Sequence, residues 1–117
     1  MAWQPQTGSV RSRKMTQIER IKQMEEYLDL SAAAVEKLDA ALEEYESVQN
    51  QYKKLSDYYG SVRWMKDLEA DEAGKLPKDL KRGELSEDAV YDLIIENRDL
   101  VIRMMKLAAA ALENGVL

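Results

Sequence analysis

Apolar residues recur every three or four positions in a stretch that begins at Thr16 and contains neither Gly nor Pro before Gly60. This spacing is typical of one side of an α-helix. Because the phase does not change at Ser31, the pattern predicts one helix to about Tyr59, roughly 65 Å long, with Asp29–Ser31 as the alternative site of a break. The repeating positions are Ile21, Met24, Leu28, Ser31, Val35, Leu38, Leu42, Tyr45, Gln49 and Tyr52.

Local signals mark where helices begin and end. Thr16 and Glu19 have the spacing of a capping box, in which each side chain accepts a backbone N–H of the other residue. Gly60 followed by Ser61 indicates a helix end and a new N-cap. A short helix is therefore predicted from Val62 to about Ala73, with Gly74 as its terminator.

The remaining chain predicts a loop and a second long helix. Residues 75–85 contain Pro77 and Gly83, and we expect three leucines to anchor this loop to the core. Ser86 is the expected N-cap of a helix that ends near Glu113, and Glu87 and Asp88 suit its first turn. The loop anchors are Leu76, Leu80 and Leu85; the inward helix face is Val90, Leu93, Ile94, Asn97, Leu100, Val101, Met104 and Leu107.

No alternating strand pattern competes with these helices, so the predicted class is all-α. We expect a long N-terminal helix, a short connecting helix with a loop, and a long C-terminal helix packed back antiparallel, as in a three- to four-helix bundle or coiled coil. Residues 1–14 lack periodicity and are predicted to form a flexible arm. Residues 15–117 are predicted to form a single helical domain.

Composition narrows the available chemistry. The 117 residues include no Cys and no His, which excludes thiolate nucleophiles and removes the commonest general base and metal ligand. We therefore expect no cofactor and favour a protein that is not an enzyme.

Charge and hydropathy indicate the surroundings. The 22 acidic residues outnumber the 17 basic ones, which disfavours binding to nucleic acid or anionic lipid. No apolar run approaches the roughly 20 residues of a membrane span, and no secretory signal is evident. The expected location is the cytoplasm.

Two acidic groups are candidate sites. Asp67, Glu69, Asp71 and Glu72 faintly resemble a calcium loop, although Glu72 stands where that loop needs Gly. A carboxylate ladder on the last predicted helix comprises Asp88, Asp92, Glu96 and Asp99. Its last three members resemble the carboxylates of helical magnesium-dependent nucleotide pyrophosphatases. The nearest partner motif, at Glu25–Asp29, lies far upstream. A solvated helix face is the favoured explanation of both groups.

Other residues suggest packing or interaction. Tyr58, Tyr59 and Trp64 suit core packing or, if exposed, a protein-binding hot spot. The basic loop bearing Lys75, Lys78, Lys81 and Arg82 suits ion pairs with neighbouring acids or an acidic partner. Ser31, Gln49 and Asn97 interrupt apolar stripes, where buried polar groups set helix register.

The central stretch resembles a known family. It combines YYGS at residues 58–61, Trp64, DEAGKLP at 71–77, DLKRG at 79–83 and LSEDA at 85–89. These motifs are similar to those of small bacterial proteins catalogued as a domain of unknown function. The resemblance extends roughly from Ile18 to Met105. It implies a helical fold and a bacterial or phage origin, and it supplies no catalytic residue.

The first predicted helix is longer than the roughly 43 Å that a last helix of about 29 residues covers. Part of its apolar stripe therefore lacks a partner within the chain, and we expect a homodimer. The favoured function is a non-enzymatic interaction protein, an adaptor or phage-type regulator. The alternative is a magnesium-dependent nucleotide hydrolase built on Asp92, Glu96 and Asp99.

Overall fold

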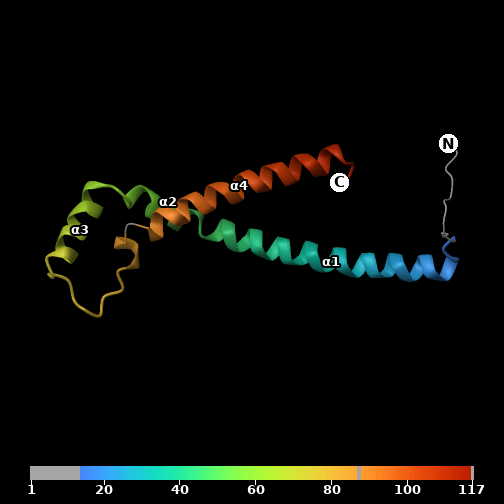
Figure 1. Ribbon diagram of the computed structural model, residues 1–117, viewed down its shortest axis with the longest axis horizontal. Helices are drawn as coiled ribbons and strands as arrows, with labels where there is room; N and C mark the ends of the chain where they lie inside the picture. Colours follow the sequence, from blue (N-terminus) through green and yellow to red (C-terminus); the bar gives the residue numbers. More distant parts are fainter. Residues whose placement is uncertain (1–13, 87, 117) are drawn as a thin grey trace, which may run out of the picture. The chain divides into compact units, whose positions relative to one another are not determined.

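The computed structural model describes residues 14–86 and 88–116, and every regular element in them is helical. The all-α prediction, with long N- and C-terminal helices, is confirmed (Figure 1). The chain divides into two compact units, Met1–Ser47 and Val48–Leu117. The elements are α1 (Gln17–Ser47), α2 (Gln49–Tyr58), α3 (Val62–Glu72), the 3₁₀ helix η1 (Gly83–Leu85) and α4 (Ala89–Glu113). Apart from Lys14, the predicted arm lies outside the described residues.

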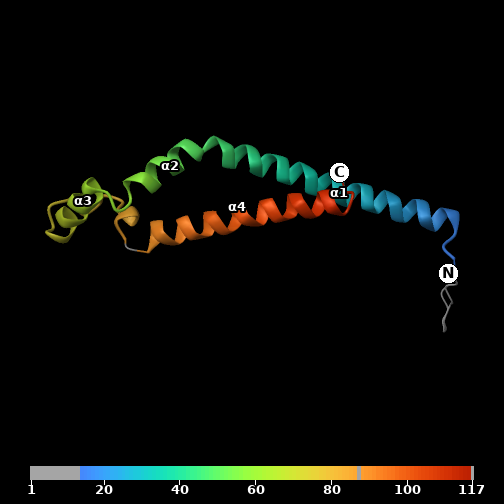
Figure 2. The same cartoon turned by 90° about the horizontal axis from the view of Figure 1, so that it is seen from above.

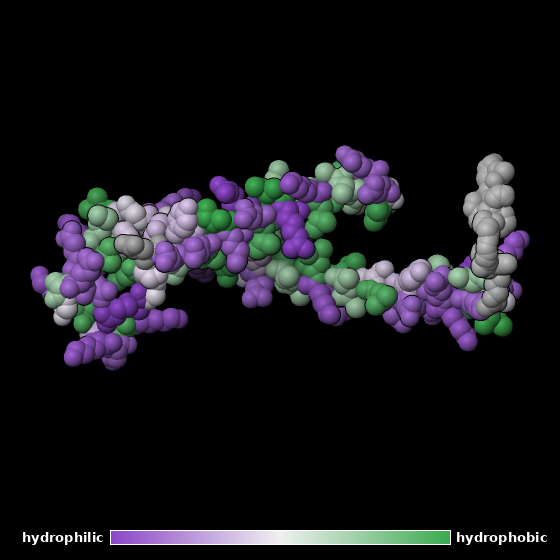
Figure 3. Space-filling model, viewed as in Figure 1, coloured by the Kyte–Doolittle hydropathy of each residue, from purple (hydrophilic) through white to green (hydrophobic). Residues whose placement is uncertain are grey.

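The first unit contains the 31-residue helix α1. Its start is the predicted capping box: the Thr16 N–H donates to Glu19 Oε1 at 2.9 Å, and the Glu19 N–H donates to Thr16 Oγ1 at 3.0 Å. The helix is continuous through Asp29–Ser31, so the alternative of a break there is wrong. No residue of α1 is buried, and apolar side chains lie at its surface (Figure 3).

The predicted helix from Thr16 to Tyr59 is interrupted at Val48, where φ is −106° and ψ is 4°. The Ser47 hydroxyl donates to the Glu44 carbonyl at 2.7 Å, a local bond that competes with the helical ladder. The ladder resumes when the Tyr52 N–H donates to the Val48 carbonyl at 2.8 Å. The interruption does not change the three- and four-residue intervals between the apolar positions on either side of it. The sequence pattern therefore does not reveal it.

The second unit begins with α2 and α3, which are separated by the predicted turn. Gly60 has a φ of +78° and Gly74, after α3, a φ of +70°, a region that favours glycine. Ser61 caps α3 by accepting the Trp64 N–H at 3.2 Å. The helix and both of its boundaries agree with the prediction to within one residue.

The segment predicted as an irregular loop contains η1, which the sequence pattern did not indicate. Ser86 accepts the Ala89 N–H at 3.0 Å, but the N-cap of α4 is Asp88, so the predicted N-cap at Ser86 lies two residues too early. The helix itself begins at Ala89, and Glu87 lies outside the described residues. Helix α4 runs opposite to α2 and contacts it (Figures 1 and 2).

The core of the second unit is small. Among its described residues, 48–86 and 88–116, those that are buried are Trp64 of α3, Leu85 of η1 and Val90 of α4. Of the three predicted loop anchors, Leu85 is buried and Leu76 is half-buried, but Leu80 is 47% exposed. The prediction for Leu80 is therefore wrong. On the expected inward face of α4, Val90 is buried and Ile94, Asn97 and Val101 are half-buried. The other members of that face are exposed: Leu93, Leu100, Met104 and Leu107.

Candidate functional site

The aromatic residues predicted as a cluster come together between α2 and α3. The Tyr59 and Trp64 rings meet edge to face, with centroids 5.1 Å apart. The Trp64 Nε1–H donates to the Glu84 carbonyl at 3.2 Å, which ties α3 to η1. Only 8% of Trp64 is exposed. Its ring therefore serves the core of the unit, the first of the two roles that the sequence suggested.

The acidic residues of α3 are engaged separately. Asp67 accepts the Tyr58 hydroxyl at 2.5 Å, within the range of a charge-assisted bond. Asp71 pairs with the Arg82 guanidinium. Glu69 and Glu72 lie exposed on α3. Within residues 14–86 and 88–116, no three carboxylates approach one another closely enough to hold a metal ion.

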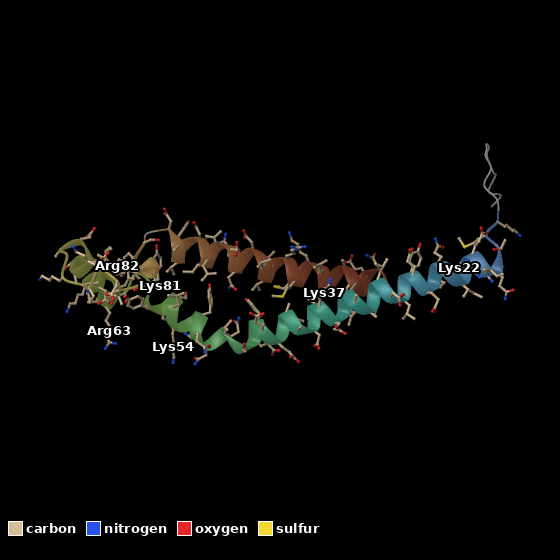
Figure 4. The ribbon with its side chains drawn as sticks, turned by 90° about the horizontal axis from the view of Figure 1, so that it is seen from below. Lys22, Lys37, Lys54, Arg63, Lys81 and Arg82 are labelled. Carbon is tan, nitrogen blue, oxygen red and sulfur yellow. The ribbon has the colours of Figure 1, made fainter. Side chains whose placement is uncertain are left out.

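Arg82 closes the loop between α3 and η1. Its guanidinium also donates to the Pro77 carbonyl, and its Nε–H donates to the Leu80 carbonyl at 3.2 Å. Lys75 and Lys81 are exposed, and Lys81 lies near Arg82 (Figure 4). Ion pairing with a neighbouring acid, one of the two predicted roles of this loop, thus accounts for Arg82 and leaves Lys75, Lys78 and Lys81 at the surface.

Glu84 was missed by the sequence reasoning. Its Oε2 atom is buried and has no hydrogen-bond partner among the described residues. Burial, and then the negative charge of Asp67, raise the pKa of Glu84 above its ordinary 4.5. Burial and the bond to Asp67 also hold the pKa of Tyr58 well above its usual range, so its hydroxyl stays a donor. The surrounding sequence carries no pattern that marks Glu84 as partly buried.

The carboxylate ladder lies on an open groove of α4 with a volume of about 720 Å³. Asp92, Glu96 and Asp99 line this groove together with two cations, Arg98 and Arg103. Arg98 Nε lies 4.0 Å from Asp99 Oδ1, and both side chains are largely exposed. The groove therefore offers mixed charges at the surface of one helix, an arrangement typical of a solvated face.

The three polar residues expected to set register lie in different surroundings. Ser31 and Gln49 are exposed, while Asn97 is half-buried on α4. Nowhere in the described part of the chain is a polar or charged residue fully buried. A register role for Ser31 would therefore need a further surface to cover α1.

The largest apolar feature of the first unit is the α1 seam, which we define as Ile21, Met24, Leu28, Ser31, Val35, Leu38, Leu42 and Tyr45. Its aliphatic and methionine side chains are exposed by 39% at Leu42 to 67% at Val35. Tyr45 is half-buried. Monomeric soluble proteins rarely leave so continuous an apolar stripe in water. The α1 seam is therefore the strongest candidate for a binding surface.

Charge on α1 is divided along the helix. From Lys14 to Gln23 there are three cations and one anion, whereas from Met24 to Ser47 there are eight anions and one cation, Lys37. Lys22 lies toward the N-terminal end and Lys37 farther along (Figure 4). A helix macrodipole favours the opposite distribution, each well-placed terminal charge being worth about 0.3–1 kcal/mol. Stability of the isolated helix does not explain this arrangement.

None of the helices in the described ranges combines the length and apolar character that crossing a membrane requires. The fold and its surfaces define the class: a small all-helical protein whose first helix presents a continuous apolar seam. The chain belongs to the family described as Domain of unknown function (DUF4298), whose model matches residues 21–107. That range includes the whole α1 seam. Neither the curated proteins nor the solved structures contain a match.

Proposed function

We propose that this chain is a non-enzymatic interaction protein, an adaptor or regulator, that binds a protein partner through the α1 seam. The observation that carries the proposal is the exposure of this seam along a helix in which no residue is buried. Most helices in proteins are stabilised by packing an apolar face against another surface. Among the described residues of its own unit, 14–47, α1 has no such surface.

The basic lysines and the aromatic cluster support a secondary role at most. Trp64 is committed to the core of the second unit, and Arg82 is committed to its loop. Lys75, Lys78 and Lys81 leave three exposed positive charges on that loop. A partner that uses them would gain little from exposed pairs of this kind.

The alternative, a magnesium-dependent nucleotide hydrolase, would use Asp92, Glu96 and Asp99. Arg98 and Arg103 in the same groove oppose the concentrated negative charge that a hard divalent cation prefers. A thermal-shift series with magnesium, manganese and nucleotides tests this alternative. We expect the melting temperature to stay unchanged; a metal-dependent rise that disappears in Glu96→Gln would favour the hydrolase.

The interaction proposal is tested by a matched pair of variants. Leu28 lies in the α1 seam, whereas Leu30 lies outside it, about 200° around the helix from Leu28; both are well exposed, at 59% and 64%. Wild-type chain, Leu28→Glu and Leu30→Glu serve as baits in extracts of cells that produce the protein. We expect proteins retained by wild type and Leu30→Glu to be lost from Leu28→Glu. Equal retention by all three baits would contradict the proposal.

A further inference from the structure

We infer that the surface that covers the α1 seam is the α1 seam of a second copy of this chain, aligned antiparallel. This inference rests on the proposed function and names its partner. The two copies would be related by a two-fold axis that crosses between the two helices at the level of Ala33. Two independent features of α1 support it: the order of residues along the seam and the division of charge along the helix.

The spacing of the seam residues is the same in both directions along the helix, so the seams of two antiparallel copies can be matched residue by residue. In an antiparallel pair of helices, each layer joins residues at equal distances on opposite sides of the axis. When the axis lies at the level of Ala33, every seam residue of one chain is opposite a seam residue of the other chain. The layers are Ile21 with Tyr45, Met24 with Leu42, Leu28 with Leu38, and Ser31 with Val35.

This register also uses nearly the whole helix. Helix α1 extends from Gln17 to Ser47, so its midpoint is one residue from the proposed axis. The last layer lies just before the interruption at Val48. A shift by one heptad would keep seam opposite seam, but it would leave about one heptad at an end of each helix without a partner layer.

Charge distinguishes antiparallel from parallel pairing. In the proposed register, Arg20 lies level with Glu46 of the partner chain, and Lys22 lies level with Glu44 of the partner chain. The basic end of each helix therefore accompanies the acidic end of the other. Parallel pairing would place two segments that each carry eight anions side by side, and like charges at that spacing repel.

The same arrangement accounts for the reversed charge polarity of α1. Cations near the N-terminus and anions near the C-terminus oppose the macrodipole of their own helix. In an antiparallel pair, the negative C-terminal end of one helix lies beside the N-terminal end and the cations of the other. The terminal charges that destabilise each helix alone then stabilise the pair; Glu25 and Asp39 of the partner chain, which are both negative and flank the same edge of the seam, oppose it.

Self-association is measured first, by sedimentation of the full chain over a range of micromolar concentrations. We expect a concentration-dependent dimer for wild type and Leu30→Glu. In Leu28→Glu a carboxylate would face Leu38 of the partner chain, so we expect dissociation at least about tenfold easier. A wild-type chain that stays monomeric throughout would overturn the inference.

Orientation is measured by cross-linking single thiols with a short bis-maleimide, since the natural chain has no Cys. In the antiparallel dimer the two copies of residue 21 lie about 36 Å apart. We therefore expect no cross-link in Ile21→Cys alone or in Tyr45→Cys alone, but a cross-link in an equal mixture of the two variants. Efficient cross-linking of Ile21→Cys alone would demonstrate parallel pairing and overturn the inference.

The two proposals fail separately. A monomeric chain that nevertheless retains another protein through the seam, with loss in Leu28→Glu and retention in Leu30→Glu, would refute self-pairing and leave the proposed function standing. A chain whose dimer is unaffected by Leu28→Glu and whose baits all behave alike would refute both.

Discussion

The two units of this chain are stabilised in different ways. The second unit, Val48–Leu117, buries Trp64, Leu85 and Val90 and joins its segments by side-chain bonds such as that from Trp64 to the Glu84 carbonyl. In the described part of the first unit, residues 14–47, helix α1 buries no residue and is held at its start by the Thr16–Glu19 capping box. Tertiary contacts support the second unit, whereas α1 depends on local bonds.

This difference shows where a partner matters most. A capping box contributes about 1 kcal/mol, which is small beside the cost of ordering a 31-residue helix. Burial of the α1 seam is the contribution that the first unit lacks. We therefore expect substitutions in the second unit to alter its own stability, and substitutions in α1 to act through association.

The largest effect is expected for Trp64→Ala. Loss of the buried ring, of its edge contact with Tyr59 and of its bond to the Glu84 carbonyl should cost about 3–5 kcal/mol of unfolding free energy. Urea unfolding followed by far-ultraviolet circular dichroism measures it. Val62→Ala, at an exposed position two residues earlier, is the control. An equal cost in both variants would show that Trp64 does not form the core.

The next effect is expected for Leu38→Ala, a seam substitution. In the associated chain it should cost about 2 kcal/mol, toward the low end for truncation of a buried leucine. Leu30→Ala removes the same atoms outside the seam and should change stability by less than about 0.5 kcal/mol. Thermal unfolding at several protein concentrations measures both. If the two variants melt alike at every concentration, the α1 seam is not buried.

A smaller effect, of opposite sign, is expected for Glu84→Gln in the second unit. The variant removes the charge of a half-buried carboxylate whose buried Oε2 atom has no partner among the described residues, so at neutral pH we expect stabilisation by about 1 kcal/mol. Glu69→Gln makes the same chemical change at an exposed position of α3 and should have little effect. Urea unfolding followed by Trp64 fluorescence, in a Trp3→Phe background, measures both.

The pH dependence of Glu84 follows from its raised pKa. The folded state binds the Glu84 proton more tightly than the unfolded state does. The contribution of Glu84 to stability is therefore fully present below its ordinary pKa of 4.5 and is lost as pH rises through the raised folded value. The gain from Glu84→Gln should accordingly shrink as pH falls from neutrality toward 4.5. A gain that is constant across this range would contradict the assignment.

The smallest effect is expected for Asp39→Lys on α1. In the proposed dimer, Asp39 and Glu25 of the partner chain flank the same edge of the seam, and both are negative. Reversing one charge should tighten the dimer about twofold to fivefold. Asp29→Lys, with the same charge change outside the flanking positions, is the control for sedimentation. Equal tightening by both variants would indicate a general charge effect instead of this register.

The local boundaries of the fold were readable from the sequence. Thr16 with Glu19, Gly60 with Ser61, and Ser86 each act through backbone groups within a few residues, so their bonds follow from residue type and spacing alone. The interruption at Val48 was not readable, because the helix resumes without a change of phase. Neither was η1, whose three residues carry no periodic pattern.

Some features of the candidate site could likewise be predicted from the sequence, and others could not. The α1 seam could be predicted as an apolar stripe because helical spacing alone places its residues on one side of the helix. The separate engagement of the acidic residues of α3 could not be predicted from the sequence. Asp67 is held by Tyr58, which lies 9 residues away along the chain, and Asp71 is held by Arg82, which lies 11 residues away.

By itself, the sequence determined the helical class, the capped helix ends and the continuous seam of α1, because these depend on bonds and spacings within one or two turns. Only the tertiary structure decided that Trp64 and Leu85 are buried while Leu80 is exposed, and that Glu84 has a buried oxygen without a partner. Burial depends on which distant segments meet, and residues of one type, such as these leucines, carry no local mark of that outcome.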